Sequence, residues 1–373
     1  MSSPNLLYGE VEQELRDSVR SLLRDRCDWT AVLARCESEH PYDRQLWSTL
    51  ATDLGVTGLL VPEELGGAGA GPRELAVLAE ELGSSVAPVP LLGSAVMATS
   101  ALLACSEASV ASEAVTTLAT GSAVGTVAVP LTTAPDDPFP ESVRAQDATL
   151  SGTVPTVVDL EVADKAVVPA IGEDGPGLYL LDSSAPGVTR TPITPLDLTR
   201  RIGTLELDRV PAPRVATGPR AERALHHALT TAAGVLASEQ VGLAQHCLDS
   251  TVDYVRTRYQ FGRAVGSFQA VKHRLADLWA GISTARAVAR DAADALTGSS
   301  EEAGISVAVA QSYCCDLVVL AAEEHLQLHG GIGMTWEHPA HLYLGRAKSS
   351  QLTLGTAERH RNTIATLGAL PAP

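Results

Sequence analysis

Hydrophobic residues recur at helical spacing along much of the chain. In the second half, this spacing predicts one long amphipathic helix over residues 221–258, a second over about 268–296 and a third over 301–328. Residues 5–50 show the same period, and small residues dominate from there to about residue 118. The pattern therefore predicts helices at both ends of the chain, with closely packed helices in the N-terminal part.

The pattern changes in the middle of the chain. Residues 124–215 contain short runs rich in β-branched residues, separated by clusters of Pro, Gly and Asp, which is typical of an all-β domain. We therefore predict an α+β multidomain fold. It consists of an N-terminal α-helical domain (1–120), a middle antiparallel β-sandwich or barrel domain (121–216) and a C-terminal four-helix-bundle domain (217–373). A chain of 373 residues is long enough for two or three such cores.

The chain is strongly acidic. It carries 44 acidic and 27 basic side chains, with a formal net charge of −17, which argues against nucleic acid or an anionic membrane as the main partner. We find no uninterrupted apolar run long enough to span a bilayer and no signal peptide at the acidic N-terminus, so we expect a cytoplasmic protein. The six cysteines show neither metal-ligand nor disulfide-framework spacing, which fits a reducing compartment and predicts no metal.

Residues 256–278, with the sequence RTRYQFGRAVGSFQAVKHRLADL, combine a cation, an aromatic ring and a glycine turn ahead of a helix. Such a corner suits an anionic, planar ligand. Arg258 could pair with a pyrophosphate, while Gln260 and Gln269 could form hydrogen bonds further along it. The structural alternative is an Arg that closes a corner between two helices beside a buried Phe261. The pattern alone leaves both interpretations open.

Five segments together resemble the acyl-CoA dehydrogenase family. RYQFG followed by SFQAVKHRLADL is similar to the family's R-x-x-F-G … F/H-Q … LADM segment, and QLHGGIGMTWEHPAHLYLGRAKS is similar to its Q-x-x-G-G-x-G loop and the helix beyond. LGTAERHRNTIA stands where the family has G-T-S-x-x-Q-R-N. LLVPEELGGAG resembles the N-terminal P-E-E-x-G-G-x-G turn, and VGLAQ resembles the helix before the Arg corner. The segments follow the family's order over nearly the whole chain, so the resemblance is specific.

The resemblance implies the fold of that family and FAD bound between subunits. Most of the matching residues would contact the pyrophosphate and adenosine parts of an FAD held mainly by a neighbouring chain, with glycines that let backbone N–H groups approach closely. Thr356 and Glu358 would lie near the adenine or pyrophosphate end, and the structural alternative for Gly330–Gly331 is a helix C-cap. The candidate cofactor-binding residues are Arg258, Gln260, Phe261, Gln269, Gln327, Gly330, Gly331, Thr356 and Glu358.

The base that would remove the substrate α-proton is absent from both positions that the family uses. The usual Glu directly precedes the Gly-Thr of the last motif, where this chain has Leu354. The other position, on the helix before the Arg corner, is Ala232, followed by Ala233 where the family often has an Arg. Neither replacement can accept a proton. Glu239 lies on the same helix face but about 10 Å further along the axis, so we expect a network or capping role for it, and the catalytic residue stays unknown.

The middle domain also lacks residues that the family commonly uses at the active site. The family commonly has T-E-P-x-x-G-S-D for the flavin ring and the substrate, whereas residues 131–139 read LTTAPDDPF, with Thr132 or Thr133 as the only counterparts. Val157 and Val158 stand where side chains would be expected to face the flavin. The chain therefore keeps the half of the FAD site that it offers to a neighbour and weakens the half that it would use itself.

This asymmetry matches heteromeric acyl-CoA dehydrogenases of high-GC actinobacteria, including those that degrade steroid side chains, in which one subunit carries the base. We therefore predict an FAD-dependent acyl-CoA dehydrogenase subunit that acts on an acyl-CoA together with a second acyl-CoA dehydrogenase-like subunit, as a dimer or tetramer. An electron-transfer flavoprotein is the expected acceptor. The alternatives are a self-sufficient homo-oligomeric dehydrogenase, a flavin-dependent oxidase or hydroxylase, and a non-catalytic scaffold.

The segment TWEHPAHLYL places His338 and His341 three residues apart on a predicted helix. That spacing permits a metal-binding pair or a proton relay, but the sequence shows no third ligand near them. We therefore expect surface or interface histidines and no metal site.

Overall fold

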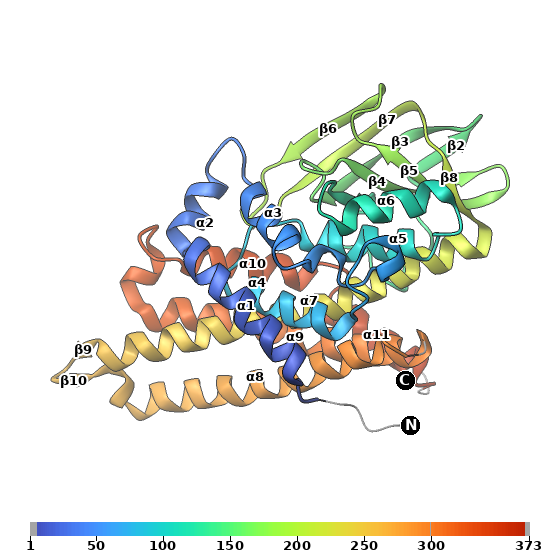
Figure 1. Ribbon diagram of the computed structural model, residues 1–373. Coiled ribbons are helices and arrows are strands. Elements are labelled where there is room, and N and C mark those ends of the chain that lie inside the picture. The colour runs from blue at the N-terminus through green and yellow to red at the C-terminus, as the bar shows by residue number, and fades with distance from the viewer. Residues whose placement is uncertain (1–5, 299, 370–373) are drawn as a thin grey trace.

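The computed structural model describes residues 6–298 and 300–369. A helical N-terminal part, a sheet and a C-terminal helical bundle follow one another along the chain, as predicted. Figure 1 shows the bundle across the lower half of the molecule, with the sheet above one end of it. The short hairpin that joins two of the long bundle helices, residues 218–257 and 269–295, projects at the other end.

The N-terminal part consists of α-helices, two short 3-10 helices and one π-helical segment. Its elements are α1 (Glu10–Arg26), α2 (Trp29–Cys36), α3 (Arg44–Thr52), η1 (Val56–Gly58), η2 (Glu63–Leu65), α4 (Pro72–Ser84), η3 (Leu91–Ala98), α5 (Thr99–Leu103) and α6 (Ser109–Ala119). Helix α4 begins at Pro72, which lacks the N–H that a first helical position leaves unpaired. The carboxylate of Glu74 accepts a hydrogen bond from the Gly71 N–H at 2.9 Å and so caps the helix.

The middle part is one sheet of eight strands with the order β6-β7-β3-β2-β4-β5-β8, and β1 pairs with β4. Most neighbours are antiparallel, but both β1 and β2 run parallel to β4, so the sheet is mixed where the sequence predicted an antiparallel one. The strands are β1 (Gly125–Val127), β2 (Val143–Gln146), β3 (Thr149–Val158), β4 (Lys165–Gly172), β5 (Gly175–Asp182), β6 (Val188–Ile193), β7 (Ile202–Pro211) and β8 (Arg214–Thr217).

The C-terminal part is built around three long helices and two shorter ones. Its elements are α7 (Gly218–Thr257), the hairpin β9 (Tyr259–Gln260) and β10 (Arg263–Ala264), η4 (Val265–Ser267), α8 (Gln269–Ala295), α9 (Ser300–His329), η5 (Gly330–Met334), α10 (Ala340–Leu352) and α11 (Ala357–Leu367). The three long helices lie where the apolar spacing predicted them.

Helices α4 and α7 pack so closely that only glycine fits at two contact points. A Cβ on Gly83 would lie 2.2 Å from the backbone oxygen of Glu239, and a Cβ on Gly242 would lie 1.8 Å from that of Glu80. Both distances are far below van der Waals contact, so any larger residue would push the helices apart. The abundance of small residues in both helices therefore reflects backbone-to-backbone packing, and it buries the middle of α7 on all sides.

The largest core joins the N-terminal helices, the bundle and one face of the sheet, while the other face of the sheet has a smaller core of its own. Helix α9 lies inside the large core, where it packs against α7, α8, α10 and α11. By length and composition alone this helix could cross a membrane, although the sequence suggested no such run. Because 61% of its most apolar window is buried within the protein, its apolar character is explained by its central position in the bundle.

Candidate functional site

The predicted Arg corner forms the β9–β10 hairpin at the exposed end of α7 and α8 (Figure 1). Phe261 and Gly262 both have positive φ, at 53° and 74°, which makes the tight turn typical of a two-residue hairpin. The Phe261 side chain is 91% exposed and meets only the edge of the Phe268 ring, with 6.2 Å between ring centroids. The structural alternative required a buried Phe261, so it does not describe this corner.

The polar side chains of this hairpin also face outward. Arg258, Gln260 and Gln269 are exposed, and within the described residues Arg258 forms no ion pair and no side-chain hydrogen bond. Arg263 instead stacks on the Phe268 ring at 3.8 Å, which stiffens the base of the hairpin. The hairpin thus presents an unpaired guanidinium and an open aromatic ring, a combination that can receive a phosphate group and a planar ring system.

The glycine segment η5 lies at the same end of the bundle. The ring of Tyr254, near the end of α7, stacks on His329, the last residue of α9, with centroids 4.4 Å apart. Gly330 follows at once with a φ of 63°, and a Cβ on Gly330 or Gly331 would meet nothing within 4 Å. Gln327 is exposed on the last turn of α9. The left-handed backbone at Gly330 favours glycine there. At Gly331 no described neighbour requires a small residue, so Gly331 leaves an open backbone surface.

Thr356 and Glu358 lie elsewhere. Thr356 caps α11 by accepting a hydrogen bond from the Arg359 N–H at 3.3 Å, and Glu358 is exposed on the first turn of that helix. Figure 1 shows α11 at the end of the bundle opposite to the hairpin. The structure therefore divides the nine candidate residues into two separate groups, one at the hairpin end and one at α11.

The position of the usual base is closed. Leu354 is fully buried, and its backbone N–H donates a hydrogen bond to the Leu131 carbonyl at 2.8 Å. A Cβ on the next residue, Gly355, would lie 3.1 Å from the Ala134 side chain. The two segments that were expected to carry the base and to hold the flavin ring are thus in direct contact with each other at this point.

Ion pairs hold the segment 131–139 in this place. Arg359 on α11 contacts the carboxylates of Asp136 and Asp137 at 3.0 Å each, and Thr363 donates a hydrogen bond to Asp136 at 2.9 Å. On the other side, His226 of α7 bonds the Pro135 carbonyl at 2.8 Å. Each exposed pair contributes little free energy by itself, but together they fix the segment to both α7 and α11.

The second base position, its neighbour and the two positions expected to face the flavin are also buried within this chain. Ala232 and Ala233 have no exposed surface, and Val157 and Val158 belong to the two hydrophobic cores. Both valines pack within this chain, and their expected place beside a flavin stays a prediction.

Glu239 belongs to a buried ion-pair network. Arg346 of α10 contacts its carboxylate at 2.9 Å, and Arg200, from the segment before β7, donates a further hydrogen bond to the same oxygen. Burial by itself would raise the pKa of Glu239, but the two guanidinium charges hold it below its ordinary value. A carboxylate with a lowered pKa and both oxygens engaged is a poor general base. The expected network role is what the structure shows.

Sequence reasoning did not find the partners of this network. Arg200 and Arg346 lie 39 and 107 residues from Glu239, and nothing in local spacing links them. Arg346 follows the apolar run LYLG, where an arginine needs a partner. Arg200 stands among polar and charged residues and gives no such signal.

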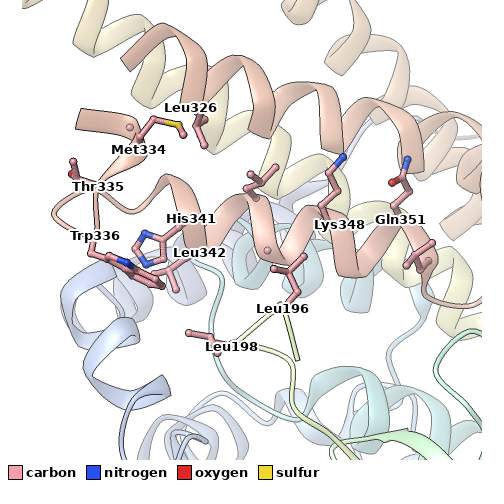
Figure 2. Close-up of a pocket in the computed structure, with 14 residues that line it drawn as sticks. Leu196, Leu198, Leu326, Met334, Thr335, Trp336, His341, Leu342, Lys348 and Gln351 are labelled. Atoms are coloured by element: carbon pink, nitrogen blue, oxygen red, sulfur yellow. The ribbon is translucent and has the colours of Figure 1, made fainter. Parts of the chain in front are cut away.

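An apolar cavity of about 710 Å³ opens beside α10. Figure 2 shows Trp336 and His341 at one end of this cavity and Lys348 and Gln351 at the other, while Leu196 and Leu198 enter it from the segment after β6. Its apolar rim is exposed, since Met334 and Trp336 keep 73% and 65% of their surface open. The cavity adjoins η5, so exposed apolar surface continues from the glycine segment along α10.

Comparison with known proteins gives a consistent set of relatives. The family models described as "Acyl-CoA dehydrogenase, N-terminal domain" and "Acyl-CoA dehydrogenase, C-terminal domain" match residues 9–122 and 223–367. The chain is 36% identical over 351 residues to "Acyl-CoA dehydrogenase IpdE2" of Mycobacterium tuberculosis, covering 91% of this chain and 92% of that protein.

Two solved structures cover nearly the whole chain. The Tcur3481-Tcur3483 steroid ACAD superposes with a TM-score of 0.85 at 33% identity, over 98% of this chain and 99% of that one. The ChsE4-ChsE5 complex from Mycobacterium tuberculosis superposes with a TM-score of 0.87 at 28% identity, over 99% and 100%.

Proposed function

Because this chain belongs to the acyl-CoA dehydrogenase family, whose members are FAD-dependent oxidoreductases of CH–CH bonds, we propose that it serves as the partner-type subunit of a heteromeric enzyme. In this role it completes the flavin site of a second acyl-CoA dehydrogenase-like subunit, and that subunit carries the base. The observation that carries the proposal is the hydrogen bond from Leu354 to Leu131, which closes the chain's own base position while the hairpin end stays open.

The exposed groups at the hairpin end fit part of an FAD. We assign Arg258 to the pyrophosphate, because an exposed guanidinium that has no partner in the described part of the chain can form charge-assisted hydrogen bonds to it. The open ring of Phe261 can pack against the adenosine, and Gly331 leaves room for a backbone N–H to approach. Gln260, Gln269 and Gln327 are placed to add hydrogen bonds along the same ligand. When bound, FAD accepts the hydride that leaves the acyl-CoA.

Thr356 and Glu358 require a different assignment. They lie beside the closed base position, at the far end of the bundle from Arg258. We propose that these two residues take no part in contacting the FAD held by the hairpin end.

A partner of the same fold is supported by the named relatives and by the surface. The two solved structures described above carry double names, Tcur3481-Tcur3483 and ChsE4-ChsE5. In this chain, the exposed apolar rim around Trp336 and Met334 adjoins the proposed flavin-contact segment, where a second subunit would cover it. We propose a dimer or tetramer of two chain types in the cytoplasm, with an electron-transfer flavoprotein as the acceptor and an acyl-CoA thioester as the substrate.

The test is to express the chain alone and together with the acyl-CoA dehydrogenase-like chain encoded beside it. Each preparation is mixed anaerobically with a panel of short-chain, long-chain and steroid-bearing acyl-CoA thioesters, and flavin bleaching at its visible band is followed. We expect bleaching only for the co-expressed complex, because Leu354, Ala232 and the paired Glu239 cannot take up the α-proton.

A yellow homo-oligomer of this chain that bleaches without a partner would show that it is self-sufficient and would rule out the proposal. Oxygen consumption that depends on NADH and a reductase, with no bleaching by any acyl-CoA, would instead identify the flavin-dependent hydroxylase alternative.

A further inference from the structure

Three histidines converge where α9 ends and the chain turns back into α10. His325 and His329 stand one helical turn apart on the same face of α9, and His338 comes from the segment between η5 and α10. Each offers a ring nitrogen, and the three nitrogens lie within 4.8 Å of one another. The sequence had paired His338 with His341 and shown no further ligand near them, but the structure brings two more histidines next to His338.

The hydrogen-bond partners of His325 leave one ring nitrogen with a free lone pair. The Thr251 hydroxyl has a single hydrogen, and it donates this hydrogen to the Cys247 carbonyl at 2.6 Å. The 3.0 Å contact between Thr251 Oγ1 and His325 Nδ1 therefore has the histidine as donor. In neutral imidazole the other nitrogen, Nε2, is then an acceptor. It is buried without a partner among the described residues, and His325 has no exposed surface.

His329 is fixed in the same tautomer. Its Nδ1 lies 2.7 Å from the His325 carbonyl, and a carbonyl only accepts, so the hydrogen is on Nδ1 and the lone pair is on Nε2. His338 is less constrained, because its one contact, from the Ala340 N–H to Nδ1, is long at 3.3 Å. An unpartnered buried imidazole nitrogen has a free-energy cost, and the Nε2 of His325 lies close to ring nitrogens of His329 and His338 that can share a partner with it.

Other side chains enclose the cluster. His325 has no exposed surface and His329 is also buried. The ring of His246 stacks on Tyr343 at 4.2 Å and closes one side of the cluster, and Tyr254 stacks on His329 from another. Neutral imidazole is the form that binds a metal ion.

We propose that His325, His329 and His338 together bind one divalent first-row transition ion, Zn²⁺ being the expected one. An all-imidazole donor set selects such ions over Mg²⁺ and Ca²⁺, which need oxygen ligands. A pair of histidines one turn apart on a helix with a third from elsewhere is a common zinc arrangement, with water in the fourth position. The hydrogen bonds from Nδ1 of His325 and His329 supply the outer contacts that orient ligand rings.

Binding would draw the three nitrogens closer. With Zn–N distances of about 2.0–2.1 Å, a tetrahedral site places its nitrogens about 3.3 Å apart, so we expect the segment that carries His338 to move inward. The ion would then tie the end of α9 to the start of α10, with η5 between them. It acts as a structural clamp on the glycine segment, and the existence of the site depends neither on a flavin nor on a partner subunit.

The experiment uses the full-length chain purified with a tag that contains no histidine and then stripped with a chelator. Zinc is measured by mass spectrometry after reconstitution, and Co²⁺ is titrated while its visible ligand-field bands are recorded. We expect one ion per chain and the intense bands of tetrahedral cobalt. His338→Gln should weaken Co²⁺ binding by more than the roughly 10- to 100-fold that loss of an outer contact causes, and His329→Gln should do the same.

His341→Gln is the matched control. His341 lies three residues from His338, but among the described residues it bonds only the His338 carbonyl, and its ring meets that of Trp336. It should bind Co²⁺ like the wild-type chain. Circular dichroism of the metal-free variants shows whether each one folds. A folded wild-type chain that takes up no more metal than His338→Gln would overturn the proposal and leave a cluster of histidines bridged by protons. Loss of binding in His341→Gln would also overturn this ligand set.

Discussion

Replacement of Glu239 by Gln is expected to lower the free energy of unfolding by about 3–5 kcal/mol. The substitution keeps the side-chain shape but removes the negative charge between Arg200 and Arg346, both of which are buried. Two guanidinium groups would then be left in the interior without their main counter-charge, although Arg346 also lies 3.8 Å from Asp197. Chemical denaturation followed by circular dichroism measures the change, and a loss below about 1 kcal/mol would show that the pair is effectively solvated.

Glu323→Gln provides the control for this prediction. Glu323 contacts Lys348 at 2.9 Å, the same distance as that between Glu239 and Arg346, but Glu323 is exposed and Lys348 is only partly buried. We expect a change within about 0–1 kcal/mol. The comparison separates the effect of burial from the effect of the ion-pair contact itself. In a co-expressed complex that remains folded, Glu239→Gln should still support flavin bleaching, because Glu239 is not the base.

Arg258→Ala is expected to weaken FAD binding in the assembled complex by roughly 10- to 150-fold, which corresponds to about 1.5–3 kcal/mol for a charge-assisted contact. Arg258 is exposed and has no ion-pair partner among the described residues, so its removal should leave the stability of the isolated chain nearly unchanged. FAD affinity is measured by fluorescence titration of the complex after its flavin has been removed.

Arg256→Ala is the control, because Arg256 is an exposed arginine on the last turn of the same helix. This substitution removes the same positive charge from the hairpin end but leaves Arg258 in place. It should retain most of the FAD affinity. Equal losses for both variants would mean that only the overall positive charge of the hairpin end matters. Unchanged affinity in Arg258→Ala would remove the assignment of this residue to the pyrophosphate.

The sequence predicted the parts of the fold that depend on local periodicity. The three long helices of the bundle could be located because their apolar positions repeat every three to four residues over many turns. The change to short β-branched runs likewise marked the sheet between Gly125 and Thr217. The parallel pairing of β1 and β2 with β4 could not be predicted, because it depends on contacts between strands and not on the pattern within one strand.

In the candidate site, too, only residues that are neighbours in the sequence could be predicted. The hairpin residues were found because Arg258, Phe261 and Gly262 are neighbours in a recognisable motif. The counter-charges of Glu239 and the histidines next to His338 come from distant parts of the chain, so no spacing rule reveals them. The absence of a base at Leu354 was visible in the sequence, but only the structure shows that its backbone is bonded to Leu131 and that the position is closed.

The central claim is that this chain lends a flavin-contact surface to a partner and holds no working flavin site of its own. The most direct measurement is the flavin content of the purified complex with the second acyl-CoA dehydrogenase-like chain, with protein counted by amino-acid analysis and FAD by absorbance after release. The account predicts one FAD for each pair of unlike chains, and a colourless preparation when this chain is expressed alone. One FAD for every chain, or a flavin-loaded homo-oligomer of this chain alone, would contradict it.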